Sequence, residues 1–249
     1  MDMIYTYLDL TDSTNAFLLR LPEQERAGNV VWAGGQTAGK GMASNGWESA
    51  PNQNLTFSIG LDLSFMKAAD QFLLSQAVPL GLLDVLDTMG LDMVEPNASL
   101  SVKWPNDLYA GSRKLCGILI NSTLHGQDMG VSVVGIGLNV NQLRFHDWPT
   151  HPVSLRMLLG RELPLEPLLR QLVAAVGHRV QLLKSSEGIS TIKTDYLNRL
   201  YRYRTWGDYE VEGRRVKRFI TGIDRFGRLE TLDESGTKYV YDIKEIAFK

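Results

Sequence analysis

The sequence predicts an α+β fold, in which a mixed, largely antiparallel sheet with flanking helices is followed by a small C-terminal β-barrel. A hairpin signal at Gly111-Ser112, between two strand-like segments, predicts the antiparallel pairing. Long segments of helical periodicity lie among the strands and predict the flanking helices. Near Trp206 the pattern changes to short strands about ten residues apart, which is typical of a small barrel. We therefore expect a larger domain at 1–204 and a β-barrel domain at 205–249.

The elements of the larger domain follow from helix caps and periodicity. Thr11-Asp12-Ser13 supplies N-cap candidates before an apolar segment. Gly90 stops a long helical pattern, in which Pro79 should cause a kink. The predicted elements are, in chain order, a helix from near Ser13, strands at Val30–Ala33 and Leu55–Leu63, a helix at Ala68–Met89, the central hairpin, a strand at Val131–Leu138, and helices at Leu165–Leu183 and Ser190–Tyr203.

The smaller domain consists of short strands separated by turns that contain glycine. Its predicted strands are Tyr209–Glu212, Arg215–Gly222, Arg228–Leu232 and Lys238–Ile243. A unit of roughly 45 residues has little hydrophobic core of its own, so we expect it to pack against the larger domain.

The central hairpin fixes a cation and a carboxylate on rigid strands. Pairing outward from its turn sets Tyr109 opposite Lys114 and Asp107 opposite Cys116. Asp107 and Lys114 then share one face, roughly 7–8 Å apart on the diagonal, with Lys103 close behind. From spacing alone, a solvated ion pair on an exposed sheet face is the commoner explanation, because such pairs are frequent and weak.

Composition excludes several classes of protein. A net charge of −2 argues against a general polyanion binder. The lone Cys116 permits no intramolecular disulfide, and the four histidines never fall at metal-ligand spacing. No apolar run approaches the ~20 residues that span a bilayer, and the first residues lack the features of a signal peptide. We expect a cytoplasmic protein without membrane contact.

Two motifs fall short of the nucleotide-binding patterns that they first suggest. Gly34-x4-Gly39-Lys40-Gly41 lacks the Ser or Thr of a P-loop after its lysine, and no helix pattern follows. The loop can still wrap an anion through free N–H groups and one lysine, or be a plain surface loop.

Gly135-Ile-Gly-Leu-Asn-Val140 has valine where a dinucleotide site needs its third glycine. Asn139 and Asn141 either line a site or form a turn.

Several motifs together resemble the biotin protein ligases, a family of biotin–[carboxyl-carrier-protein] ligases. KWPND at Lys103–Asp107 and the following KLCGIL are similar to the centre of that family's active site. The similarity includes Ser13-Thr14-Asn15, Gln36–Gly41, Gly135–Asn141 and the C-terminal tail, so it covers nearly the whole chain in the right order. It implies the fold of that family's catalytic core, which is shared with class II synthetases.

The resemblance implies a two-step reaction with ATP and Mg²⁺, in which biotin is activated as biotinyl-AMP and joined to a lysine of a biotin carboxyl carrier domain. It implies Lys114 and Lys40 as catalytic cations and Asp107 as a catalytic residue that helps to hold the metal. The residues that it implies for biotin are Ser13, Thr14, Asn15, Gln36, Lys40, Gly41, Met42, Lys114 and Gly117. Those for the nucleotide are Trp47, Lys103, Asn106 and Asn139.

The chain departs from the family pattern in its glycine loop. The family commonly has G-[R/K]-G-R-x-G-R-x-W, whereas this loop is GKGMASNGW, with Met42 and Asn45 at arginine positions. Lys40 is therefore the only cationic residue of this loop, and the loop should hold the adenylate less firmly than the loops of the family do. The first motif begins at Ser13, so we expect no N-terminal DNA-binding domain.

Two other functions compete with biotin ligation. A lipoate ligase has a similar core, but KWPND argues against it. A nucleic-acid binder is suggested by Arg199–Arg218, where seven basic residues face three acidic ones with tyrosines between them. A solvated basic face is the commoner explanation of that run, and it could also meet an acidic carrier domain. We expect no DNA partner, and a homodimer is possible on the family pattern.

Overall fold

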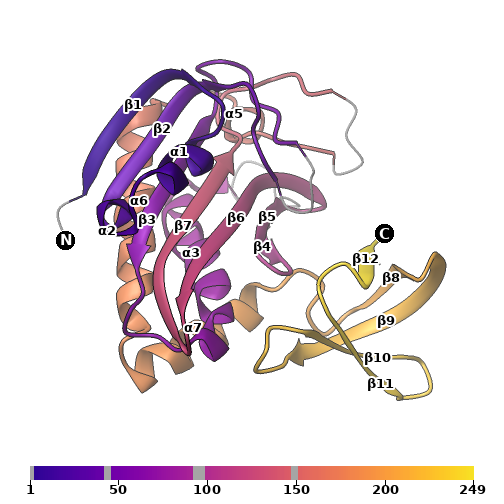
Figure 1. Ribbon diagram of the computed structural model, residues 1–249. Helices are drawn as coiled ribbons and strands as arrows, with labels where there is room; N and C mark the ends of the chain where they lie inside the picture. The colour runs from indigo at the N-terminus through magenta and orange to yellow at the C-terminus, as the bar shows by residue number, and fades with distance from the viewer. Residues whose placement is uncertain (1–2, 42–45, 92–98, 147–150) are drawn as a thin grey trace.

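The computed structural model describes residues 3–41, 46–91, 99–146 and 151–249. Its strands form a seven-stranded sheet, in the order β1-β2-β3-β7-β6-β5-β4, and a five-stranded sheet, in the order β11-β10-β9-β8-β12. Figure 1 shows the smaller sheet beside the larger one, at the lower right. The α+β fold predicted from the sequence is confirmed.

The larger sheet is mixed because β1 runs parallel to β2, whereas its other neighbouring pairs are antiparallel. Its strands are β1 (Ile4–Thr11), β2 (Asn29–Gln36), β3 (Leu55–Asp62), β4 (Leu100–Lys103), β5 (Asp107–Ala110), β6 (Arg113–His125) and β7 (Asp128–Leu138). The sequence prediction missed two of them. The edge strand β1 lacks clean alternation, since Ile4 and Leu10 are exposed, and β4 has only four residues.

Helices cover both faces of this sheet. They are α1 (Thr14–Arg20), α2 (Glu23–Arg26), α3 (Phe72–Leu86), α5 (Leu155–Leu159), α6 (Leu165–Leu182) and α7 (Ser186–Arg199), with short 3-10 turns at Ala68–Asp70 and Asp87–Met89. Successive strand residues point to opposite faces, so Val31 packs with Leu18 of α1 while Val30 joins the main core with Phe57. Figure 1 shows α1 and α2 on one face and α3, α6 and α7 on the other.

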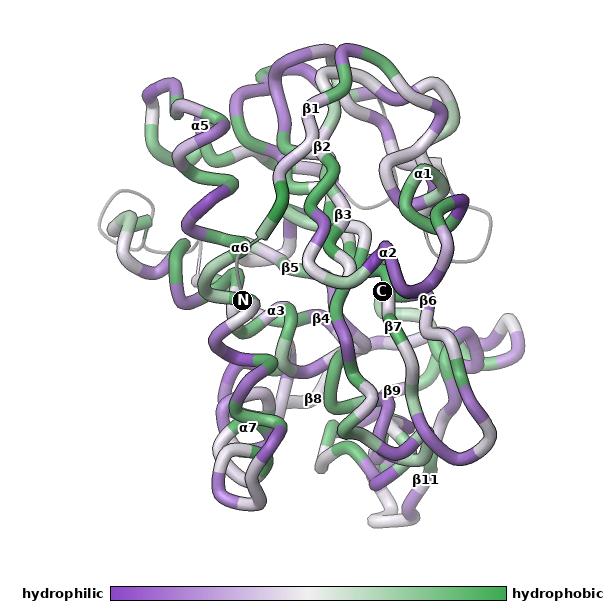
Figure 2. The backbone as a smooth tube through the Cα atoms, turned by 60° about the vertical axis from the view of Figure 1, so that its left-hand side comes forward, coloured by the Kyte–Doolittle hydropathy of each residue, from purple (hydrophilic) through white to green (hydrophobic). Residues whose placement is uncertain are grey.

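Helix α3 lies in the middle of the main core. Gly81 permits close packing on α6, because a Cβ there would lie 2.7 Å from the Cα of Val176. The stretch Phe72–Met89 has the length and apolar composition of a membrane-crossing helix, but 61% of it is buried inside the fold, as in a core helix. In Figure 2 the apolar segments (green) run through the interior, and polar segments (purple) gather at outer turns.

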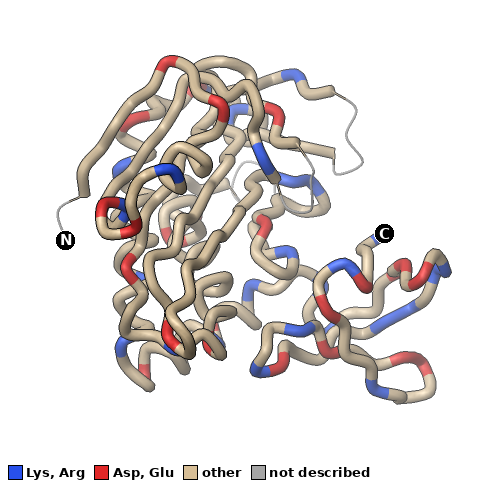
Figure 3. The backbone as a smooth tube through the Cα atoms, viewed as in Figure 1, with Lys and Arg blue, Asp and Glu red and all other residues tan. Residues whose placement is uncertain are grey.

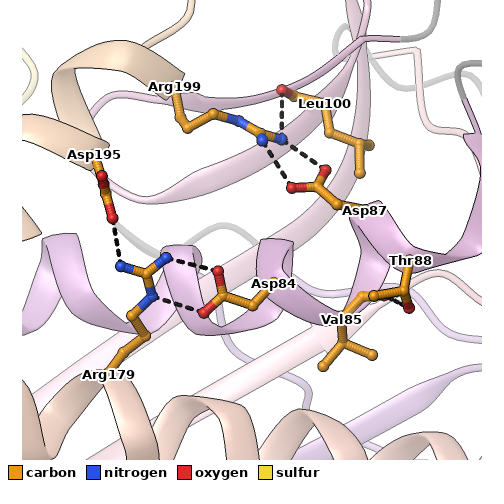
Figure 4. A network of polar contacts seen from close by, with 8 residues as sticks. All are labelled: Asp84, Val85, Asp87, Thr88, Leu100, Arg179, Asp195 and Arg199. Carbon is orange, nitrogen blue, oxygen red and sulfur yellow. Dashed lines mark hydrogen bonds and ion pairs between the residues drawn. The ribbon is translucent and has the colours of Figure 1, made fainter.

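A charged network ties the helices to β4 (Figure 4). Arg179 of α6 donates to both carboxylate oxygens of Asp84 on α3, at 2.6 and 2.7 Å, and to Asp195 on α7 at 2.5 Å. Near the end of α7, Arg199 donates to the Leu100 carbonyl of β4 at 3.1 Å. These contacts fix α7 against the strand that leads into KWPND.

The structure corrects the predicted register of the central hairpin. Tyr109 lies opposite Lys114 as predicted, but a bulge between Leu108 and Tyr109 sets Leu108, and not Asp107, opposite Cys116. Asp107 is instead paired with Lys103 of β4. The bulge adds one unpaired residue to β6, which turn geometry alone does not predict.

The last long helix also differs from its prediction. It begins at Ser186, four residues earlier than expected, because Ser185 caps it by accepting from the Gly188 N–H at 3.1 Å. It ends at Arg199 rather than Tyr203, since the Tyr201 N–H donates to the Val102 carbonyl of β4 at 2.8 Å.

The smaller sheet is antiparallel and follows α7. Its strands are β8 (Trp206–Val211), β9 (Arg214–Ile223), β10 (Leu229–Leu232), β11 (Lys238–Tyr241) and β12 (Ile246–Phe248). The sequence predicted the first four, whereas β12 has only three residues and was missed. The chain passes from one sheet to the other between Arg199 and Trp206, the stretch that contains the predicted domain boundary.

Candidate active site

A cavity of about 360 Å³ brings together residues from both sheets. Its wall is formed by the start of α1, the glycine loop, residues of the strands β2 to β7, and the tail of the smaller sheet. The sequence-predicted residues on it are Ser13, Thr14, Asn15, Gln36, Lys40, Gly41, Trp47, Lys103, Asp107, Lys114 and Gly117. Residues as far apart in the chain as Ser13 and Gly117 thus share one space.

The cation and the carboxylate of the central hairpin form an ion pair on this wall. Lys114 Nζ lies 2.6 Å from Asp107 Oδ2, and each side chain keeps only 21% of its surface exposed. The fixed pair therefore lies away from bulk water, where electrostatic interactions are stronger than at an open surface. The explanation as a fully solvated pair does not hold.

Lys103 supplies a second cation next to Asp107. Its Nζ donates to the Tyr109 hydroxyl at 3.1 Å and lies 4.8 Å from the centre of that ring. Burial lowers the pKa of Lys103, and the charge of Asp107 opposes this shift. Burial also raises the pKa of Tyr109, so its hydroxyl stays protonated at neutral pH. The ammonium groups of Lys103 and Lys114 and the carboxylate of Asp107 thus line the same cavity.

A group of neutral polar side chains lies at the start of α1. The Thr14 N–H donates to Gln36 Oε1 at 2.8 Å, and its hydroxyl is 2.9 Å from the Ser58 hydroxyl. Because Gln36 Oε1 is occupied, its amide NH₂ is the end that can donate to a ligand. Asn15 Nδ2 is buried without a partner in the described part of the chain, next to Gly135. These groups offer aimed donors to an uncharged polar ligand.

The indole of Trp47 lies against the backbone of two strands. A Cβ at Gly137 would be 2.2 Å from Trp47 Cε2, and one at Gly117 would be 3.0 Å from Cζ3. Both glycines are therefore needed for the ring to approach β6 and β7. Trp47 Nε1 is buried without a partner among the described residues, next to Gly137.

The glycine loop closes on itself beside this ring. Lys40 bridges to Gly46, and the Trp47 N–H donates to the Gly39 carbonyl at 3.0 Å. Gly39 is required by the close approach, since a Cβ there would be 2.7 Å from the Trp47 carbonyl oxygen. Met42 and Asn45 lie outside the described residues.

Comparisons with known proteins identify the family of the chain. A family model described as the biotin/lipoate A/B protein ligase family matches residues 7–139, which is just over half of the chain. The chain belongs to this family. The match includes every cavity residue predicted from the sequence, from Ser13 to Gly117.

Its relatives include biotin ligases of two kinds. The chain is 35% identical over 240 residues to the bifunctional ligase/repressor BirA of Escherichia coli. The alignment covers 92% of this chain and 69% of the relative. It is 30% identical over 198 residues to the biotin–[acetyl-CoA-carboxylase] ligase of Paracoccus denitrificans, covering 77% and 79%. The solved biotin protein ligase from Aquifex aeolicus, in complex with biotin and ATP, superposes with a TM-score of 0.76 at 22% identity over 98% of both chains, which shows the same fold.

Two residues predicted to bind the nucleotide lie behind the cavity wall in this family member. Asn139 donates to the carbonyls of Val153 and Lys114, at 3.1 and 3.5 Å, so it fixes the backbone at Lys114. Asn106 is buried in the turn between β4 and β5, and its Oδ1 has no partner in the described part of the chain. Their nucleotide contacts stay predictions.

The structure adds residues that the sequence did not single out. Tyr109 stands next to Lys103, and the sequence signal for it was its place in the hairpin. Ser58 joins the polar group through Thr14, and β12 brings Phe248 to the wall. No local signal marks Phe248, because only the docking of the smaller sheet places it there.

Mg²⁺ is implied by the family chemistry, and the donor set fits a minimal site. No cluster of three His, Cys, Asp or Glu occurs among the described residues. In ATP sites Mg²⁺ usually takes one or two protein carboxylates and completes its shell with phosphate oxygens and water. The single carboxylate of Asp107 meets that requirement.

The basic run at Arg199–Arg218 is largely engaged within the fold. Arg202 donates to the carbonyls of Asp208 and Lys249, and Arg215 pairs with Asp208 at 2.8 Å. In Figure 3 positive and negative residues are interspersed over this sheet. The contacts give these arginines structural roles, and no observation favours nucleic acid as their partner.

Proposed function

We propose that this chain is an ATP-dependent biotin–protein ligase. The observation that supports it most strongly is the Lys114–Asp107 pair, which shares one cavity with Lys103 and with the neutral polar group around Thr14 and Gln36. Charged groups for phosphate and carboxylate thus lie in the same space as donors suited to the ring urea of biotin. A site with both kinds of group can bind ATP and biotin together, as a ligase requires.

In the first step a biotin carboxylate oxygen attacks the α-phosphorus of ATP. A C–O–P bond forms, the bond between the α- and β-phosphates breaks, and pyrophosphate leaves with the electron pair. Two anions must meet, so fixed cations lower the barrier. We assign Lys114 to both anions, with Lys103 adding charge on the same cavity wall and Lys40 assisting from the loop.

Asp107 would hold Mg²⁺ through a carboxylate oxygen. The ion offsets phosphate charge when it is bound. Asp107 also orients Lys114, because the ion pair fixes the direction of the ammonium group.

In the second step the amine of an acceptor lysine attacks the carbonyl carbon of biotinyl-AMP. An amide forms, the C–O bond to AMP breaks, and the amine loses a proton. The free amine has an ordinary pKa of about 10.4, so the site must favour its neutral form.

Relatives named for acetyl-CoA carboxylase support a biotin carboxyl carrier domain as the acceptor. A cytoplasmic location is part of the proposal, supported by the single buried cysteine.

The test compares biotin with lipoate. The protein is mixed with ATP, Mg²⁺ and either biotin or lipoate, and the adenylate is detected by mass spectrometry. A biotin carboxyl carrier domain is then added. We expect biotinyl-AMP, no lipoyl-AMP, and a biotinylated carrier. Formation of lipoyl-AMP alone, or of neither adenylate, would overturn the proposal.

A further inference from the structure

The Lys103 ammonium lies between aromatic rings from two different sheets. Its Nζ is 4.8 Å from the centre of the Tyr109 ring on β5 and 5.2 Å from that of the Phe248 ring on β12. A cation near an aromatic face is attracted by the negative potential of the ring. Phe248 therefore reaches out of the smaller sheet to contact a cation of the active site.

Phe248 is held in place from its own side. It is opposite Tyr209 in the pairing of β12 with β8, and the two rings pack edge to face with centres 5.0 Å apart. The Arg202 guanidinium donates to the carbonyl of the next residue, Lys249, at 2.7 Å. The ring is thus on a strand that is fixed at its last residues.

The smaller sheet is anchored at the residue that follows Lys103. Trp104 Nε1 donates to the Gly227 carbonyl at 2.9 Å, and this contact is buried. Gly227 also packs on Phe72, where a Cβ would lie 2.2 Å from the ring. The turn between β9 and β10, in the same sheet as β12, is therefore anchored next to the cation that β12 contacts.

Neutral rings hold a cation without cancelling its charge. The ammonium of Lys114 is paired with a carboxylate, whereas Lys103 is held mainly by rings and donates one hydrogen bond to Tyr109. An ammonium group has three donors, and within the described ranges Lys103 uses one of them, so two remain for phosphate oxygens. Its burial means that an arriving anion meets a poorly hydrated charge, which strengthens the attraction.

We infer that Phe248 is a positioning residue for the nucleotide: it holds the Lys103 ammonium toward the cavity, so that the last strand of the smaller sheet sets the affinity for the triphosphate. The inference rests on the proposed function and deepens it. It assigns to the smaller sheet a definite part in ATP use that acts through one side chain.

The test measures biotin-dependent exchange of pyrophosphate into ATP by Phe248→Leu and Phe248→Tyr. Loss of the ring should raise the KM for ATP by about three- to tenfold, the range that corresponds to one partly buried cation–π contact. The KM for biotin should stay at the wild-type value, and Phe248→Tyr should retain the wild-type KM for ATP. Phe219→Leu is the matched control, because Phe219 packs on Trp206 in the same sheet and does not line the cavity.

Two further variants separate positioning from structure. In a Lys103→Met background, Phe248→Leu should cause no additional rise in the KM for ATP, since the cation it holds is gone. Replacement of Phe248 by pentafluorophenylalanine keeps the shape but reverses the ring's charge distribution, so it should raise the KM for ATP even if Phe248→Leu does not fold.

An unchanged KM for ATP in the pentafluoro protein would overturn the inference. Equal effects of Phe248→Leu with and without Lys103, or a matching rise in the KM for biotin, would do the same. Failure of the proposed function is a different result, since the wild-type protein would then show no biotin-dependent exchange at all.

Discussion

Gly137→Ala should displace the Trp47 ring from the cavity wall. A Cβ at this position would lie 2.2 Å from Cε2 and 2.6 Å from both Cζ2 and Nε1, well inside ordinary contact. The ring would have to retreat by about 1 Å, and a shift of that size in a substrate-positioning group can cost about a hundredfold in rate. We expect a loss of about a hundredfold in kcat/KM, with a destabilisation of about 1–3 kcal/mol from overpacking.

A graded series of glycine variants makes this prediction specific. Gly117→Ala should cost less, because its nearest contact with the ring is 3.0 Å. Gly177→Ala on α6 is the control, since a Cβ there meets nothing within 4 Å and alanine favours a helix. The assay is biotin-dependent pyrophosphate exchange together with thermal unfolding. Wild-type exchange by a folded Gly137→Ala protein would refute the assigned role of Trp47.

Three further substitutions test individual parts of the site. Lys114→Ala should lower the rate of adenylate formation by about 10²–10³ while the fold is retained, and the exposed Lys193→Ala should leave it unchanged, as exchange assays would show. Thr14→Val removes the hydroxyl that contacts Ser58, although its N–H still donates to Gln36, and should weaken biotin binding by about tenfold at an unchanged KM for ATP; equal biotin affinity in calorimetry would contradict this. Met42→Arg adds a charge-assisted bond to phosphate and should lengthen the half-life of bound adenylate by about tenfold, whereas equal release rates would mean that the missing arginine is harmless.

Much of the fold follows from local sequence. The turn at Gly111-Ser112, the cap at Ser13 and the stop at Gly90 depend on neighbouring residues, and the structure has all three. The bulge opposite Leu108 depends on how β6 meets two partner strands at once, so turn geometry could not predict it. The three-residue strand β12 is too short to leave a periodic pattern.

Some residues of the candidate site could likewise be predicted from local sequence, whereas others could not. Lys114, Asp107 and Thr14 lie in contiguous motifs, so the order of residues along the chain is enough to point to them. Phe248 could not be found in this manner, because it reaches the cavity only through the docking of one sheet on another. Asn139 lies in a motif but supports the backbone behind the wall, since a motif marks a position and not the direction of a side chain.

The central claim is that a carboxylate of biotin attacks the α-phosphate of ATP in the cavity that holds Lys114. Biotin with heavy oxygen in its carboxylate tests this directly in a reaction with ATP and a carrier domain. One heavy oxygen should appear in AMP and none in pyrophosphate, because the C–O bond to AMP breaks on transfer. Release of ADP, or heavy oxygen in inorganic phosphate or pyrophosphate, would contradict the account.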